Sequence, residues 1–144
     1  MKHLPKHLRP RWRYLAVGIR TRAGADLDRR GFQRELWFAA QNLLGDPGSA
    51  DAGLSVLRFA FDPDVDPGTS AVDAGADAAT GDDADRLGRG EAIVRVRRGE
   101  VDPARAALAC VDAVDDYAVG LRVRGVSGTL RACEEKHCPM LADE

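Results

Sequence analysis

The sequence is 144 residues long, 44% hydrophobic and 31% charged, which predicts one globular domain over residues 1–144 and leaves too little chain for two. It has no apolar run of the roughly 18 residues that a membrane helix needs, and its basic N-terminus lacks the apolar stretch of a signal peptide. We therefore expect a cytoplasmic protein without a membrane partner. Its three cysteines, an odd number, do not indicate a disulfide framework.

The formal net charge of −2 conceals two opposing blocks. Residues 1–34 hold ten Lys and Arg against two Asp, whereas residues 62–90 hold eight Asp against two Arg. Outside the acidic block the chain is cationic, which points toward polyanions such as nucleic acid. We interpret 62–90 as a disordered acidic insertion, because its only sizeable apolar residues are Val65, Val72 and Leu87.

Three elements are predicted before the insertion. Alternating apolar residues predict a strand over 12–19. Apolar residues at three-to-four spacing predict a helix over 27–44, capped by Asp26 or Asp28 and ended by Gly45. A second strand follows over 54–61.

Three further elements follow the insertion. Residues 91–98 predict a strand, and the next helix has Asp102 at its N-cap and Pro103 at its first position. Another strand is expected over 117–124, and residues 126–132 predict a short fifth strand. Residues 137–144 form a variable, polar tail in this interpretation.

The order β-α-β-β-α-β predicts a ferredoxin-like α+β sandwich, with two helices on one face of an antiparallel sheet and the other face open. Side chains in one phase of the four strands share that open face. They are Trp12, Tyr14, Arg58, Arg95, Arg97, Arg122 and Arg124. Aromatic rings beside guanidinium groups form an RNA surface, because bases stack and phosphates pair with Arg. Alternating Arg also solvates an exposed sheet face, so the residues alone leave both interpretations open.

Several stretches together resemble one family, the archaeal ribonuclease P protein component 2, which is related to a eukaryotic subunit of the same ribonucleoprotein. They are KHLPKHLRPRWRYLAVGI, FQRELWFAAQNLLGDPGSA, LRFAF, ARAALACVDAV and RVRGVSGTLRACEEK. The combination of RxRYL, RELW…LLGD and VSGTLRA in this order is specific, and the resemblance extends over residues 1–61 and 91–136.

The resemblance implies an accessory subunit of an enzyme whose catalyst is RNA, and which removes the 5′ leader from precursor tRNA. It implies ribonuclease P RNA, ribonuclease P protein component 3 and precursor tRNA as partners, with Mg²⁺ bound by the RNA component. The sequence itself has no nucleophile–base motif and no phosphate-binding glycine loop, so we predict no catalytic residue and no activity from the protein alone.

The N-terminal leader is the other expected RNA contact, through Lys6, Arg9, Arg11 and Arg13. A solvated charged tail is the alternative. We favour RNA contact because Arg11 and Arg13 lead directly into the aromatic-bearing first strand.

An ACT-like small-ligand-binding regulatory domain is the alternative function, since it has the same β-α-β-β-α-β order. Such a domain would bind amino acids through loops at a dimer interface and would need no cationic sheet. Steeply salt-dependent affinity for structured RNA would distinguish the two functions.

Three further groups of residues have ambiguous roles. Cys133, His137 and Cys138, with His3 and His7, raise the question of zinc, but their spacing does not fit two close ligand pairs, so we predict no metal site. Cys110 is expected to be a buried, inert thiol. Trp37 and Phe38 are adjacent on a helix, so one of them should be partly exposed. An exposed aromatic would suit a protein contact, with component 3 as the candidate, but we favour a helix wedged between the sheet and the C-terminal tail.

Overall fold

A computed structural model describes residues 11–65 and 87–142 of the chain. Its main feature is a four-stranded antiparallel sheet in the order β2-β3-β1-β6. The four strands are β1 (Trp12–Arg22), β2 (Ser55–Val65), β3 (Leu87–Arg97) and β6 (Gly120–Ser127). The helices are α1 (Arg29–Ala52), α2 (Val101–Ala109), α3 (Leu130–His137) and α4 (Pro139–Ala142). A two-stranded ribbon pairs β4 (Ala113–Val114) with β5 (Tyr117–Ala118).

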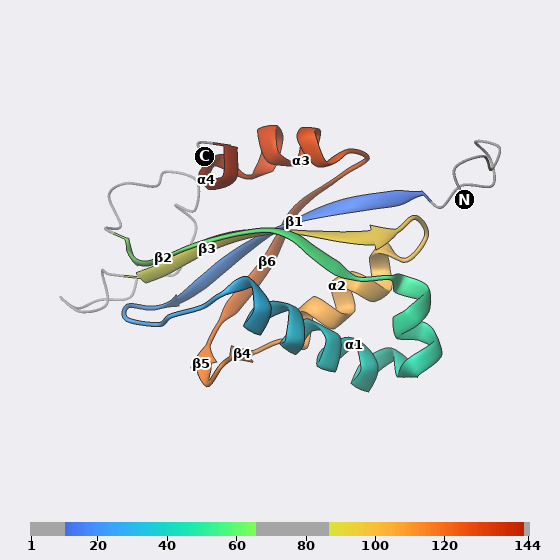
Figure 1. Cartoon of the computed structure of the whole chain (residues 1–144), viewed down its shortest axis with the longest axis horizontal. Helices are drawn as coiled ribbons and strands as arrows, with labels where there is room; N and C mark the ends of the chain where they lie inside the picture. Colours follow the sequence, from blue (N-terminus) through green and yellow to red (C-terminus); the bar gives the residue numbers. More distant parts are fainter. Residues whose placement is uncertain (1–10, 66–86, 143–144) are drawn as a thin grey trace.

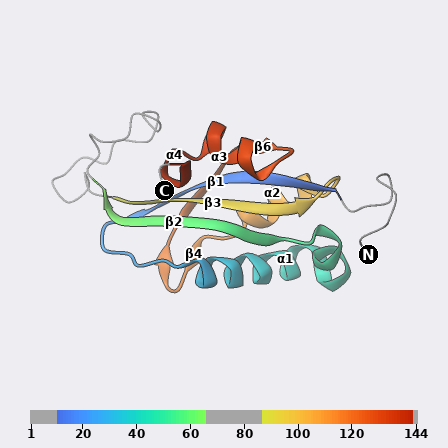
Figure 2. The same cartoon turned by 45° about the horizontal axis from the view of Figure 1, so that its top comes forward.

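This topology confirms the ferredoxin-like prediction, because β1-α1-β2-β3-α2-β6 alternates in the expected order. The sheet is a twisted layer with α1 and α2 on one side and α3 and α4 on the other (Figure 1). Turning the molecule shows α1 running along one side of the sheet while the C-terminal helices lie across the opposite side (Figure 2).

The first helix begins and breaks at residues whose chemistry explains both events. The Asp28 carboxylate accepts a hydrogen bond of 2.7 Å from the Gly31 amide, satisfying one of the free N–H groups at the helix start. Gly45 has φ 75° and ψ 172°, which interrupts the helix before Pro47 and separates off a short second segment. The predicted end at Gly45 is therefore confirmed as a kink, and helical backbone continues beyond it to Ala52.

The larger core lies between the sheet and the first two helices. Phe32, Leu36 and Ala40 project from one face of α1 and are fully buried. They pack with alternate residues of the strands, such as Leu15, Val17, Val56, Val94 and Val96. On α2, Ala104, Ala107 and Leu108 are buried and form a narrow apolar face.

A second, smaller core occupies the face that the sequence analysis left open. Ala16 and Ile93 of the sheet pack with Cys133, Cys138 and Leu141 of the C-terminal segment. The predicted fifth strand over 126–132 is therefore wrong: β6 ends at Ser127, and Thr129 caps α3 by accepting a hydrogen bond from the Ala132 amide. The described part of the predicted tail, up to Ala142, forms α4 and packs on the sheet.

Two smaller boundaries also differ from expectation. Asp102 lies in the first turn of α2, whose N-cap is Glu100 and has no side-chain capping bond. Residues 117–118, expected to open the last strand, belong to the β4–β5 ribbon, which turns at Asp115 and Asp116 with φ of 50° and 70°. Asp tolerates this left-handed conformation better than most residues, which accounts for the pair at the turn.

The edges of the acidic insertion are strand. Strands β2 and β3 continue into residues 62–65 and 87–90, and Val65 pairs with Leu87. Residues 66–86 of the predicted insertion, and 143–144 of the predicted tail, lie outside the described residues. Within the described residues, no helix combines the length and apolarity that crossing a membrane would require.

Candidate nucleic-acid interface

The interface residues predicted from the open-face strand phase lie at separate places on the α3 side of the sheet. Arg13 alternates with Trp12 and so has the phase of Leu15, which packs in the core on the α1 side. Trp12, Arg95 and Arg97 form one group at the end of the sheet where β1 begins, and we call it the Trp12 cluster. The Arg95 guanidinium carbon lies 4.0 Å from the centre of the Trp12 ring, and that of Arg97 lies 5.8 Å away. These are cation–π distances, so the Trp12 ring holds the two arginines at the end of the sheet where β1 begins.

This geometry changes the role expected for Trp12. One face of its ring is occupied by Arg95, and its edge contacts the backbone at Gly53, where an added Cβ would lie 3.3 Å from Trp12 Cζ3. Tyr14 is half-buried and packs with the second core, next to Cys133, whose thiol donates to the Tyr14 carbonyl at 3.6 Å. The positions of the two rings therefore support a structural role better than the base stacking predicted from strand phase.

Arg122 and Arg124 lie on β6, at the other end of the covered face. They are about 20 Å from the Trp12 cluster, because Gly18, which pairs with Arg122, is six residues along β1 from Trp12. The Arg124 guanidinium lies against the Gly18 backbone, where an added Cβ would be 2.8 Å from its Nε. Its Nη1 reaches to 3.8 Å from the buried Glu91 carboxylate on β3.

The Glu91 carboxylate in turn fixes the C-terminal segment. It accepts a hydrogen bond of 2.6 Å from the Met140 amide at the start of α4. Arg124, Glu91 and Met140 thus connect β6, β3 and α4 across the sheet. Arg124 is consequently held in a defined position, with its charge partly balanced by Glu91.

Two arginines missed by the sequence analysis extend this basic region. Arg20 and Arg89 are register partners on β1 and β3, and Arg20 also pairs with Gly120 of β6. Both follow the strand phase that places Trp12 and Arg95 on the α3 side. Period-two alternation could have identified them, but the predicted first strand stopped at Ile19 and Arg89 had been assigned to the insertion.

The N-terminal leader is only partly described. Arg11 is exposed and Arg13 is half-buried at the start of β1, where Arg13 Nη1 donates to the Trp12 carbonyl at 3.3 Å. Lys6 and Arg9 lie outside the described residues. Arg58, on the edge strand β2, pairs with Glu134 of α3 at 3.1 Å and so helps to hold α3 on the sheet.

The cysteines are explained by packing. Cys133 and Cys138 are buried in the second core, and a hydrogen bond with Cys133 together with burial raises the pKa of the Cys138 thiol above its ordinary value. Within residues 11–65 and 87–142, no three His, Cys, Asp or Glu side chains gather as a metal site would require. His3 and His7 are outside that range. Cys110, predicted to be buried, is exposed at the end of α2.

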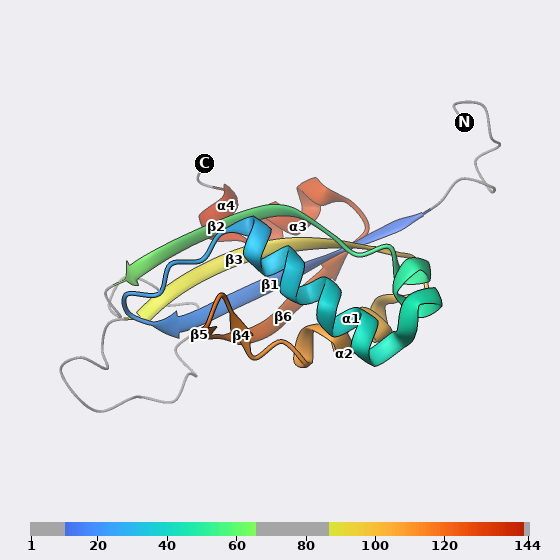
Figure 3. The ribbon, with the colours of Figure 1, turned by 60° about the horizontal axis from the view of Figure 1, so that its bottom comes forward.

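The opposite side of the molecule has an exposed apolar patch on α1. Trp37 and Phe38 are 47% and 53% exposed, and Leu43 is 46% exposed; we call these three the α1 patch. Viewed from below, α1 lies in front of the sheet, away from the C-terminal helices (Figure 3). The interpretation that the C-terminal tail wedges this helix is therefore wrong.

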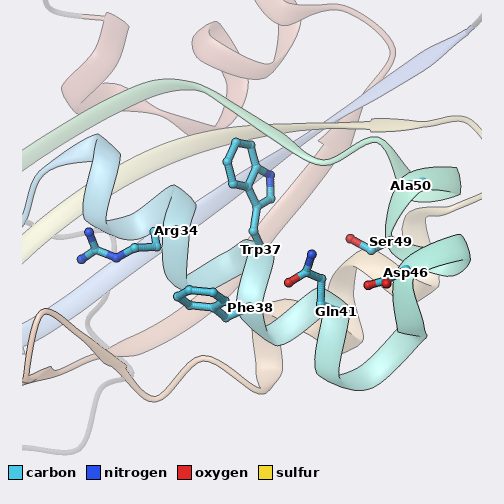
Figure 4. A pocket seen from close by; sticks show the side chains of 7 residues that line it. All are labelled: Arg34, Trp37, Phe38, Gln41, Asp46, Ser49 and Ala50. Atoms are coloured by element: carbon cyan, nitrogen blue, oxygen red, sulfur yellow. The ribbon is translucent and has the colours of Figure 1, made fainter.

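The α1 patch borders a cavity of about 520 Å³ between the two segments of the kinked helix. Figure 4 shows Trp37 and Phe38 pointing in different directions, with Ser49 and Asp46 on the segment beyond the kink. Trp37 Nε1 donates to the Leu54 carbonyl at 3.1 Å, which fixes the indole against the start of β2. An exposed, positioned aromatic pair of this kind is typical of a protein-binding surface.

Comparison with known proteins gives a consistent result. A sequence model of the Rpp14/Pop5 family matches residues 13–138. The chain is 58% identical over 137 residues to a protein named ribonuclease P protein component 2 from Halorubrum lacusprofundi, an alignment that covers 95% of this chain and 71% of the relative. The protein of the same name from Haloarcula marismortui is 57% identical over 137 residues, with 95% and 70% covered.

A more distant relative covers nearly all of both chains. The ribonuclease P protein component 2 of Methanosarcina mazei is 27% identical over 136 residues, which are 94% of this chain and 91% of the relative. These matches support the resemblance drawn from the sequence motifs, and they give no support to an ACT-like regulatory domain.

Proposed function

The chain belongs to the Rpp14/Pop5 family and is a ribonuclease P protein subunit, and from this premise we propose that it binds and supports the catalytic RNA while precursor tRNA is cleaved. The observation that carries the proposal is the charge of the sheet and its C-terminal helices. The described residues 11–22, 54–65, 87–97 and 120–142 hold twelve Lys and Arg against five Asp and Glu.

The arginine-rich surface suits contact with RNA backbone. Guanidinium groups pair with phosphates in a bidentate manner, and the Trp12 ring and the Gly18 backbone preorganise two of them. Phosphate contacts orient a protein on RNA without reading sequence. This is the property that a subunit supporting a folded catalytic RNA requires.

In this proposal the chemical step belongs to the RNA. Mg²⁺ held by RNA phosphates would activate the nucleophile and stabilise the developing charge during cleavage of the 5′ leader. The protein would lower the repulsion between RNA strands and so reduce the Mg²⁺ concentration that folding and catalysis need. The protein contributes positively charged side chains to the complex and no catalytic residue of its own.

We propose the α1 patch as the contact for ribonuclease P protein component 3. The patch lies on the side of the sheet opposite the arginines, so protein and RNA can bind together. Its neighbour Arg34 forms an ion pair with Asp115, which holds the β4–β5 ribbon beside α1. A hydrophobic centre bordered by charged groups is the usual anatomy of a specific interface.

Reconstitution tests the proposed function. This protein and component 3 are added together to ribonuclease P RNA at limiting Mg²⁺, and 5′-leader release from precursor tRNA is measured. We expect the pair to stimulate cleavage and the RNA-free proteins to show none. Cleavage by rigorously RNA-free protein, or no stimulation at any Mg²⁺ concentration, would contradict the proposal.

A further inference from the structure

A second cavity lies between β6 and α3, on the same side as the arginines. Its volume is about 400 Å³, within the range of roughly 300–1,000 Å³ typical of sites for small organic groups. Arg122 and Arg124 line it from β6, and Lys136 and His137 line it from the last turn of α3. The sequence pattern predicts no functional role for Lys136, and it raises His137 only in connection with zinc.

The cavity is built by fixed contacts. Arg124 is held against Gly18 and toward Glu91, and only 13% of its side chain is exposed. His137 lies against Gly125, where a Cβ would come within 2.4 Å of its Nε2. Glycine at both positions lets the Arg124 guanidinium and the His137 imidazole approach the backbone of the sheet closely. The walls are therefore set before any ligand arrives.

The charge balance of the cavity is positive. Its one acidic lining residue, Glu135, accepts a hydrogen bond of 2.9 Å from Arg131 one turn earlier on α3. The buried Glu91 carboxylate partly balances the charge of Arg124. Within the described chain, Arg122 and Lys136 form no ion pair with a carboxylate, and both are exposed.

Because Arg122 and Lys136 remain available, the cavity favours an anion that carries more than one acceptor oxygen. The partial negative charge at the end of α3 opposes an anion, but two full positive charges outweigh a half-charge. Arg20 and Arg89 lie on the neighbouring strands β1 and β3, on the same side of the sheet as Arg122.

We propose that the β6–α3 cavity binds a backbone phosphate of RNA, with Arg122 and Lys136 as its direct ligands and Arg124 as the residue that positions the site. This inference rests on the proposed function, and it assigns one phosphate contact to a defined pocket. Arg20, on the neighbouring strand β1, would contact a following phosphate of the same RNA strand.

The test compares two charge-matched double variants of the full-length protein. Arg122→Gln with Lys136→Gln removes both proposed ligands, whereas Arg30→Gln with Arg105→Gln removes two exposed arginines from α1 and α2. Affinity for ribonuclease P RNA is measured as a function of salt concentration. We expect about tenfold weaker binding for the cavity variant and a log–log salt slope flatter by about 0.7 to 0.9. The control should match the unaltered protein.

Ethylation interference locates the phosphate. Ethyl groups on one or a few RNA phosphates should block binding of the unaltered protein and the control, and should have no effect on the cavity variant. Arg122→Lys with Lys136→Arg, which keeps both charges, should restore most of the affinity. Equal affinity, slope and interference for the cavity variant and the control would overturn the proposal while leaving RNA binding intact.

A second arm separates this inference from the proposed function. Inorganic phosphate is titrated into the full-length protein, and the NMR signals of His137 and Lys136 are followed. Shifts at these residues without any RNA binding would overturn the proposed function and retain an anion site. Neither shifts nor RNA binding would overturn both.

Discussion

The two sides of the sheet differ in charge and in how they are covered. The segments that carry α1 and α2, residues 23–53 and 98–119, hold ten Asp and Glu against five Arg. The strands with the C-terminal helices reverse this balance. The α1 side is closed by a large core and exposes aromatic rings, whereas the α3 side has a small core flanked by arginines. One sheet can thus present the proposed protein-binding side and the proposed RNA-binding side.

The largest expected effect is a difference between the two cores in how much each contributes to the free energy of unfolding. Leu36→Ala, at a fully buried position of α1, should lower the free energy of unfolding by about 2–5 kcal/mol. Leu141→Ala removes the same atoms from the small core near the end of the described chain, and should cost only about 1–2 kcal/mol, because α4 can loosen locally. Chemical denaturation measures both. Equal losses would show that the C-terminal helices are as integral as α1.

A smaller effect concerns the attachment of α4. Glu91→Ala leaves the Met140 amide without its acceptor and Arg124 without its carboxylate, and should destabilise by about 1–3 kcal/mol. Glu91→Gln keeps an acceptor oxygen and should lose less. Hydrogen exchange at the Met140 amide should accelerate most in the Ala variant. An unchanged exchange rate there would show that Glu91 does not hold α4 on the sheet.

Arg11, just before β1, and Arg13, the second residue of β1, should affect RNA binding alone. Arg11→Gln with Arg13→Gln should flatten the log–log salt dependence by about one to two units while the melting temperature stays constant. The loss should be similar for RNAs of different sequence, because backbone contacts carry little base information. An unchanged slope in the folded variant would reduce these arginines to solvated surface.

The smallest effect is expected from the acidic segment. Val65 pairs with Leu87, so a short turn can replace residues 66–86 without moving either strand. Thermal melting should shift little, since shortening a loop changes stability by only about 0.6 kcal/mol per halving of length. Weaker RNA binding after this replacement would contradict the view that the α3 side supplies the RNA contacts without help from the insertion.

Strand phase and helix periodicity predicted most of the sheet and α1, because each buries a regular row of apolar residues against one partner. The C-terminal helices escaped prediction because Cys133, Cys138 and Leu141 are too few and too widely spaced to show a period. Their packing depends on Ala16 and Gly125, small residues that leave room on the sheet. The sequence shows such residues but not what fills the space above them.

The candidate site was likewise predictable from the sequence only in part. Alternation correctly placed Arg95, Arg97 and Arg122 on one side of the sheet, and with longer strands it would have included Arg20 and Arg89. It could not show that Arg95 lies over the Trp12 ring. It also could not show that Lys136 lines the same cavity as Arg122, because their proximity depends on the angle between α3 and β6.

The division between the two sides is tested most directly by measuring both binding activities in two variants. Arg20→Gln with Arg122→Gln alters the α3 side, and Phe38→Ser with Leu43→Ser alters the α1 patch while retaining the Trp37 hydrogen bond. Affinities for ribonuclease P RNA and for component 3 are measured for each folded variant. The first should lose RNA affinity and keep component 3, and the second should do the reverse. Loss of the same partner by both variants would contradict two separate binding sides.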